Sequence, residues 1–241
     1  KVNYTFNHFR RHAVDANVST PVGKGWGLSI GTYHNMDPGS NHLDMTTLQE
    51  SIHFYKAAVS KTWNEGRGKA GLIYQYSHNK EITENYGPFI FVGDGSVEEY
   101  DGFKLGIDQY RPANKMVKYL DVATGQMTEQ DIDDANINQV HNVNFLLDYK
   151  WDNGMKLSVH SKFKHGHSYR ANPNMMGVSE ATAESGYTYE DGTPYIGKVQ
   201  TRRMLHFDGF EHSWLTNAEL TGKSRDHRHH WRAEIDYWLN A

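Results

Sequence analysis

The sequence predicts an all-β fold of antiparallel, up-and-down strands that form an arc of a transmembrane β-barrel. Three observations support this prediction. Apolar and polar residues alternate with a period of two over long runs, short turns and long loops join these runs in turn, and a tryptophan lies near each short turn. The runs are about 10 to 12 residues long, whereas globular strands usually have roughly 5 to 6 and bilayer-crossing strands roughly 9 to 11.

Composition excludes several other classes. The net charge is −4, which gives no strong attraction to nucleic acid. The absence of cysteine excludes a disulfide framework, thiol chemistry and cysteine-based zinc sites. The sequence contains no run of 18 apolar residues, so no membrane-spanning helix is predicted. The mean hydropathy of −0.76 does not argue against a membrane barrel, because only alternate residues of its strands meet lipid.

The first two predicted hairpins lie before residue 79. The first consists of residues 9–22 and 26–34, joined by a glycine-rich turn at 23–25. The second consists of residues 51–63 and 69–78, joined by a turn at 65–68. The apolar residues of 48–63 also fit a helical spacing, so a surface helix remains an alternative for that strand.

The third hairpin shows the alternation most clearly. Residues 139–151 and 155–167 flank the turn Asp152-Asn153-Gly154, whose Asn and Gly accept positive φ. Leu146 is the one exception to the alternation in its first strand. The fourth hairpin comprises residues 211–222 and 229–240.

Two long outer loops are expected, at about 79–138 and about 168–210. A connection as long as the first is unusual in a compact domain unless it has a function. Within it, residues 119–126 have the sequence of a hairpin tip, and residues 128–136 suit a short capped helix.

Alternation alone does not say which face points outward, because a soluble barrel has the same period with its apolar face inside. The alternating turn and loop lengths, the tryptophans beside the turns, and the ionised side chains of the opposite face all favour a membrane barrel. The four tryptophans are Trp26, Trp63, Trp151 and Trp231.

The direction of the strands predicts that both chain ends lie on the outer side, and hence that the eight predicted strands are part of a larger barrel. Eight strands closed on themselves would be filled by side chains and would pass nothing large. The whole chain, residues 1–241, is accordingly expected to be part of one outer-membrane barrel domain.

Three segments, VSTPVGKGWGLSIGTYHN, NEGRGKAGLIYQYSHN and YRPANKMVKYLDV, resemble the barrel of TonB-dependent outer-membrane receptors, in the form common in Bacteroidetes. This resemblance implies a barrel of 22 strands, location in the bacterial outer membrane and energy-coupled nutrient import. It also implies partners: outer-membrane lipid, the TonB complex, a surface lipoprotein, and a small-molecule cargo such as an iron complex or a glycan. No plug domain and no TonB box are matched in this chain.

The resemblance further implies that the polar inner face lines the path of the cargo and that the long loops capture it. The expected lumen-lining residues are Asp148, Lys150, Lys156, His160, Lys162, Glu219, Arg232, Glu234 and Asp236. The expected ligand-binding residues of the loops are Tyr86, Tyr100, Tyr110, Tyr169, Tyr187 and Tyr189, whose rings would stack on a sugar or on a flat ligand.

No catalytic residue, cofactor or metal site is predicted. His165 and His167 share one side of a strand, and His227, His229 and His230 cluster near a turn, but solvated polar residues explain both groups better than a metal or haem site does. The acidic loop at 94–102 lacks the EF-hand spacing. Because no nucleophile or nucleotide motif is present, the chain is not expected to be an enzyme. The alternatives are a passive porin and a soluble ligand-binding β-barrel.

Overall fold

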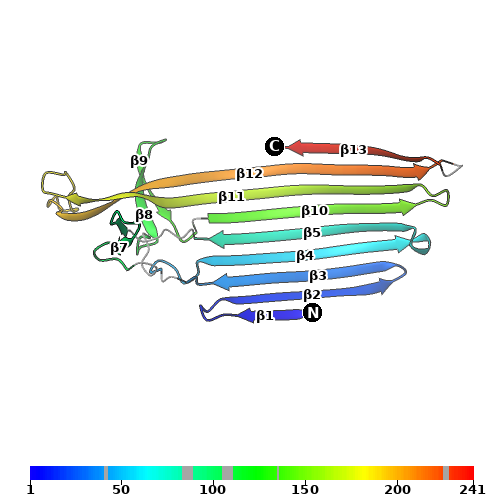
Figure 1. The fold of residues 1–241 in the computed structure, drawn as a ribbon, viewed down its shortest axis with the longest axis horizontal. Coiled ribbons are helices and arrows are strands. Elements are labelled where there is room, and N and C mark those ends of the chain that lie inside the picture. Colours follow the sequence, from blue (N-terminus) through cyan, green and yellow to red (C-terminus); the bar gives the residue numbers. More distant parts are fainter. Residues whose placement is uncertain (41–42, 83–88, 105–110, 135, 225–227) are drawn as a thin grey trace.

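The computed structural model describes the chain except for residues 41–42, 83–88, 105–110, 135 and 225–227. Its main element is one antiparallel sheet of nine strands in the order β1-β2-β3-β4-β5-β10-β11-β12-β13 (Figure 1). The strand bounds are β1 Val2–Phe6, β2 His12–Gly23, β3 Trp26–Asp37, β4 Glu50–Trp63, β5 Gly68–Glu81, β10 Asn136–Lys150, β11 Lys156–Ala181, β12 Gly197–Lys223 and β13 His230–Asn240. Nearly all regular structure in the described residues is therefore antiparallel β, as the period-two pattern predicts.

The connections separate into two ends of the sheet. At the end that we call the turn end, on the right of Figure 1, the chain reverses between β2 and β3, β4 and β5, β10 and β11, and β12 and β13. At the opposite end, the loop end, residues 38–49, 82–135 and 182–196 make the longer connections. Glycines form the tight turns where φ is positive, as at Gly25 (φ 76°) and Gly154 (φ 83°). A 3₁₀ turn, η1 (Asn64–Gly66), joins β4 to β5.

The long connection 82–135 contains small elements of its own. Two short hairpins lie in it, one formed by β6 (Phe89–Phe91) with β7 (Val97–Glu99) and one by β8 (Met116–Asp121) with β9 (Gln126–Asp131). The predicted hairpin tip at 119–126 is confirmed, because β8 and β9 reverse there. The helix predicted for 128–136 is wrong: residues 126–131 pair with β8, and this pairing supplies the backbone hydrogen bonds that a capped helix would have made internally.

The only buried apolar cluster in the described part of the chain lies at the loop end. Leu43, Met45, Ile82 and Ile132 form it, and Val117 and Met204 pack against it. These residues come from the β3–β4 connection, the ends of β5 and β9, β8 and β12. The cluster therefore fastens the small β8–β9 hairpin to the end of the large sheet.

The predicted loop at 168–210 is mostly strand. β11 and β12 stay paired from Lys156 with Thr221 to Ala181 with Gly197, with one irregularity between Met175 and Gly177. The neighbouring strand β10 stops pairing at Arg170, so from there β11 and β12 continue as a two-stranded ribbon (Figure 1). The Asn-Pro-Asn sequence suggests a loop, but Pro173 is tolerated because β11 has lost its neighbour on one side. We call the part beyond Arg170 the ribbon.

Eight strands of the sheet correspond to those predicted, although β11 and β12 are much longer than predicted, and residues 51–63 are strand β4 rather than a helix. A ninth strand, β1, was not predicted. It pairs with β2 from Val2 with Ala16 to Phe6 with His12, so the chain enters from the middle of the sheet and runs toward the loop end. The expectation that both chain ends lie on the outer side is therefore wrong for the N-terminal end. β13 runs toward the loop end as expected.

Replacing Ile132 by Ala should loosen the loop end while leaving the large sheet intact. Ile132 is fully buried, and a buried Ile→Ala change costs about 2–5 kcal/mol. Amide hydrogen exchange in β8 and β9 should accelerate, with exchange in the middle of β10 unchanged. The control is Leu120→Ala, because Leu120 is 58% exposed on the same hairpin. Equal acceleration in both variants would contradict a role for the buried cluster.

Candidate functional site

The strand register assigns each residue of the sheet to one of two faces, because directly paired residues share a face. One face carries the even-numbered residues of β2, β3, β5 and β12 and the odd-numbered residues of β4, β10, β11 and β13. We call this the apolar face and its opposite the polar face. Leu146, the exception to the alternation, lies on the polar face between Gly71 and His160.

The apolar face has no second layer over it. Its side chains remain exposed in the middle of the sheet, with Ile30 at 57%, Leu72 at 46% and Ile235 at 71%. Phe145 and Phe163 are likewise exposed. A contiguous apolar surface of this extent is rare on a soluble monomer and marks contact with an apolar partner.

The central part of this face is almost free of charge. Four successive cross-strand rows contain one charged side chain, that of Lys61. The first row is Val18-Ile30-Ala57-Tyr74-Val143-Phe163-Trp214-Leu239, and the last is Trp63-Gly68-Tyr149-Leu157-Leu220-Ala233. Lys61 lies at the turn end, 4.9 Å from the centre of the Trp26 ring. From Tyr149 in one bordering row to His141 in the other, β10 advances eight residues, roughly 27 Å along the strand at about 3.4 Å per residue. At the strand tilt of roughly 35–45° found in outer-membrane barrels, this length corresponds to a height of about 20 Å, and the lipid-facing band of such barrels is about 25 Å tall.

Aromatic rings border the band at the turn end. Trp63 stacks on Tyr149 with ring centroids 6.3 Å apart, and Tyr149 meets Trp151 edge to face at 5.0 Å. The Trp63 ring lies over Gly68 and the Trp231 ring over Gly222, so that each ring occupies the space a side chain would take. Trp26 pairs with Gly23 at the same end. The four tryptophans predicted to lie beside the turns therefore form one edge of the apolar face.

Histidine and tyrosine rings border the band at the loop end. Two adjacent cross-strand rows contribute them, and we call these residues the ring belt: His34, His53, His78, Tyr55, Tyr76, His141, His165, His167, Phe210 and His212. His34 Nδ1 lies 2.8 Å from His53 Nδ1, and the rings of His165 and His212 stack at 4.5 Å. The ring belt crosses six neighbouring strands, so its rings are in near-continuous contact across the sheet.

Polar groups within the band bond to one another. Ser161 Oγ lies 2.8 Å from Thr216 Oγ1, and the indole Nε1 of Trp214 donates to Ser161 Oγ at 2.9 Å. The Tyr74 hydroxyl lies 2.8 Å from Nδ1 of His141 in the ring belt. This mutual satisfaction lowers the cost of placing hydroxyl and indole groups in an environment without water.

The polar face carries all nine predicted lumen-lining residues, which the register places together on β10 to β13. Ion pairs connect several of them: Lys156 Nζ is 3.4 Å from Asp148 Oδ1, and Arg232 Nη2 is 2.8 Å from Glu219 and 2.6 Å from Glu234. Asn217 Nδ2 donates to both Glu234 and Asp236. A few apolar side chains interrupt this face, among them Ile73 and Trp238. That these residues line a lumen stays a prediction.

The predicted loop tyrosines do not form one site. Tyr86 and Tyr110 lie outside the described residues. Tyr169 belongs to strand β11, where its hydroxyl donates to Gln130 Oε1 at 2.8 Å and braces the β8–β9 hairpin. Lys198 Nζ lies 4.8 Å from the centre of the Tyr100 ring. Tyr187 and Tyr189 are exposed in the β11–β12 connection, where Tyr189 meets Tyr195 edge to face.

No group of three or more metal-ligating side chains is found in the described part of the chain. His165 and His167 do share one face, but each contacts aromatic rings of the ring belt. His227 lies outside the described residues. In the acidic loop, Asp94 accepts bonds from Ser96, and Asp101 pairs with Lys198 at 2.9 Å, so these two carboxylates have partners within the protein.

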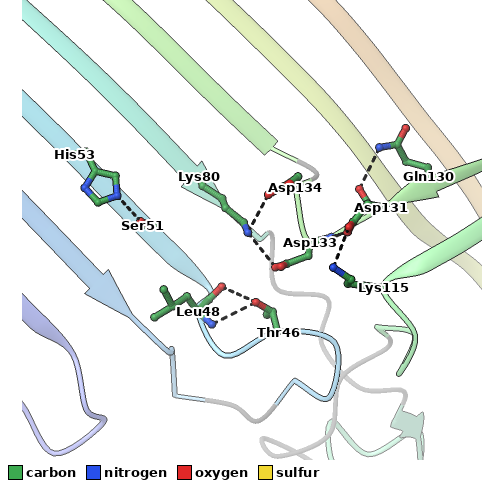
Figure 2. Close-up of polar contacts among 10 residues, drawn as sticks. All are labelled: Thr46, Leu48, Ser51, His53, Lys80, Lys115, Gln130, Asp131, Asp133 and Asp134. Carbon is green, nitrogen blue, oxygen red and sulfur yellow. Dashed lines mark hydrogen bonds and ion pairs between the residues drawn. The ribbon is translucent and has the colours of Figure 1, made fainter.

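Charged contacts fasten the long connection to the sheet. Lys80 Nζ, at the loop end of β5, lies 3.1 Å from Asp133 and 3.0 Å from Asp134 (Figure 2). Lys115 Nζ lies 3.1 Å from Asp131 Oδ2 (Figure 2). The other carboxylate oxygen of Asp131, Oδ1, accepts a hydrogen bond from the backbone N–H of Asp133. These ion pairs flank the buried Ile132. Residues 131–134 are therefore attached to the large sheet by both apolar packing and ion pairs.

A cationic pocket between β8 and the ribbon was not predicted from the sequence. Lys118, Arg202, Arg203 and His206 line a cavity of about 740 Å³, and Asp121 is its one carboxylate among the lining residues. Arg111 is buried close to Arg202. Its burial, together with the positive charge of Arg202, lowers the pKa of Arg111 to about 10. The adjacent arginines at 202 and 203 were the available signal, but the pairing of β8 with β9 and the ribbon's course bring the cations together.

Lowering the pH should detach the β8–β9 hairpin. Burial alone would raise the pKa of Asp131, but the backbone N–H of Asp133 and the Lys115 ammonium outweigh it and hold this pKa below its ordinary 3.8. Because the folded pKa is depressed, the stabilisation is complete above about pH 4 and is lost as the pH falls through the folded value. Hydrogen exchange of β8 and β9, corrected for intrinsic rates, should rise over that range in the wild type. Asp131→Asn should flatten the pH dependence and Asp191→Asn, in the distant β11–β12 connection, should not; an unchanged profile in Asp131→Asn would refute this role.

Within the described residues, no helix has the length and hydropathy needed to cross a membrane. No protein-family model, no curated protein and no solved structure significantly matches this chain.

Proposed function

We propose that this chain forms part of the wall of an outer-membrane β-barrel that serves as a receptor for nutrient uptake. The observation that carries the proposal is the uncovered apolar face, with its charge-poor band of bilayer height between two borders of aromatic rings. Tyr, Trp and His have an apolar body and a polar edge, which suits them to the boundary between lipid and water.

The two faces differ in a way that favours lipid on the apolar side. A soluble barrel of this size would bury Phe145, Leu72 and Ile235 in its interior and expose its charges. Here the mid-band polar groups bond to each other, whereas the ion pairs of Asp148, Lys156 and Arg232 lie on the opposite face. That arrangement fits a lipid environment outside and water inside.

The two edge strands of the sheet support barrel closure in this proposal. β1 and β13 each have only one partner strand among the described residues. An open edge within hydrocarbon would leave backbone N–H and C=O groups without hydrogen bonds, at several kcal/mol each, so membrane sheets close on themselves. We therefore infer that further strands complete the barrel, and the family resemblance described above suggests 22 in all.

Uptake rather than simple anchoring is proposed because of the loop end. The buried cluster and the ion pairs of Lys80 and Lys115 fasten the described part of the long connection around β8 and β9 to the sheet. A surface held in this way suits the capture of cargo, which the polar face would then conduct inward. Energy coupling through TonB, a surface lipoprotein partner and a cargo such as an iron complex or a glycan enter this proposal from the resemblance alone.

An arginine in the middle of the band should destabilise the protein in a bilayer, whereas its neighbour on the other face should tolerate the same change. Leu72 is in one of the two middle rows of the band, and Arg at the middle of a bilayer costs about 2–4 kcal/mol. The matched control is Ile73→Arg, one residue along the same strand on the polar face. Urea unfolding from phospholipid vesicles measures both variants. Equal costs for the two, or a larger cost at Ile73, would overturn the proposed orientation.

A receptor and a porin differ in their resting conductance. The complete barrel that contains this chain, purified and inserted into planar lipid bilayers, should give no steady ion current, since an energy-coupled receptor keeps its path closed without energy input. Single-channel recording under an applied voltage makes the measurement. Regular stepwise currents in the absence of any cargo would instead identify a passive porin, while leaving the membrane placement intact.

A further inference from the structure

The cationic pocket lies at the loop end, where cargo would first meet the protein. Its walls are the strand β8 and the beginning of β12 in the ribbon. The volume of about 740 Å³ falls within the roughly 300–1,000 Å³ usual for small-molecule sites. Apolar side chains, including Val117, Leu120 and Leu205, make up much of the remaining wall.

The charge of the pocket is strongly unbalanced. Lys118, Arg202 and Arg203 form no ion pair with any carboxylate in the described part of the chain, in contrast to Lys80, Lys115 and Lys198 close by. The single acid, Asp121, is occupied by its own turn: its Oδ1 accepts the Ala123 N–H and its Oδ2 the Thr124 hydroxyl, each at 2.9 Å. The pocket therefore presents net positive charge.

Arg202 is the key group. It donates one bond to Gln200, while its Nη1 is buried and has no hydrogen-bond partner among the described residues. Burial lowers the pKa of Arg202, and the buried guanidinium of Arg111 adds a second positive charge nearby. A partly desolvated guanidinium such as that of Arg202 is costly unless an anion compensates it.

We propose that this pocket binds a small organic anion, with a carboxylate or phosphate group on the guanidinium of Arg202 and an aliphatic body against the apolar wall. Guanidinium groups bind both kinds of anion through paired, charge-assisted hydrogen bonds. Lys118 and Arg203 supply further charge at the rim. This inference names the class of cargo and so rests on the proposed function.

Isothermal titration calorimetry of the purified protein tests it, with adipate and inorganic phosphate as anionic probes and sucrose as a neutral one. Adipate and phosphate should bind with millimolar affinity or better, more weakly at high salt, and sucrose should not bind at this pocket. Arg203→Gln and Lys118→Gln, at exposed or half-exposed positions, should each weaken adipate binding about tenfold. Lys223→Gln, at the far end of the same strand β12, is the control and should bind as the wild type does.

Absence of adipate and phosphate binding, or equal affinity in Arg203→Gln and Lys223→Gln, overturns the proposal. Vesicles with and without anionic phospholipid separate a soluble anion from a lipid headgroup: loss of binding to anionic vesicles in Arg203→Gln, with adipate affinity unaltered, would also overturn it. Because calorimetry in detergent does not depend on how the sheet faces lipid, failure here and failure of the Leu72→Arg test are distinguishable.

Discussion

The register of the nine-stranded ladder is the constraint on which the other features depend. A shift of one residue in any pairing would exchange the two faces of that strand, placing Asp148 and Lys156 among Phe145 and Leu157. The pairing of β10 with both β5 and β11 is continuous over its length, so the faces are fixed together rather than strand by strand. The charge-poor band and both ring borders exist only because every strand keeps this register.

Two kinds of stabilisation are divided between the ends of the molecule. The sheet has backbone hydrogen bonds and cross-strand pairs but little dry interior, whereas the loop end has the buried cluster around Ile132 together with ion pairs. In water, the sheet would expose its largest apolar surface, which is thermodynamically unfavourable. In a bilayer that surface is solvated by lipid, and the loop end retains a stable attachment of its own.

The alternation of apolar and polar residues made the large strands predictable, since a period of two is a local property of the chain. Residues 51–63 were ambiguous because Tyr55, Val59 and Trp63 satisfy both periods, and pairing with β3 and β5 decides for strand. β1 was missed because its few residues, before Asn7, give too short a pattern. The face shared by Asp148, Lys156 and Glu234 followed from alternation, but their ion pairs depend on register.

The cationic pocket could not be predicted for a different reason. Lys118 and Arg202 are far apart in the sequence, and only the folding of β8–β9 against the ribbon makes them neighbours. The Asn-Pro-Asn sequence argued for a loop where the chain continues as a strand. Local signals describe which residues can form a hairpin, but not how far beyond its neighbours that hairpin extends.

The ribbon extends eleven residues past the last β10 partner of β11, from Arg170 to Ala181, which is roughly 36 Å at about 3.3 Å per residue. A two-stranded ribbon on its own is only marginally stable in water. Tyr169 against Gln130 and Met204 against the buried cluster brace it near its base, and Lys198 with Asp101 and Tyr100 braces it near its tip. The ribbon is therefore supported near both ends, and since β11 and β12 run without a chain break from the band into it, a movement of the long connection at Asp101 would bend the same two strands that cross the sheet.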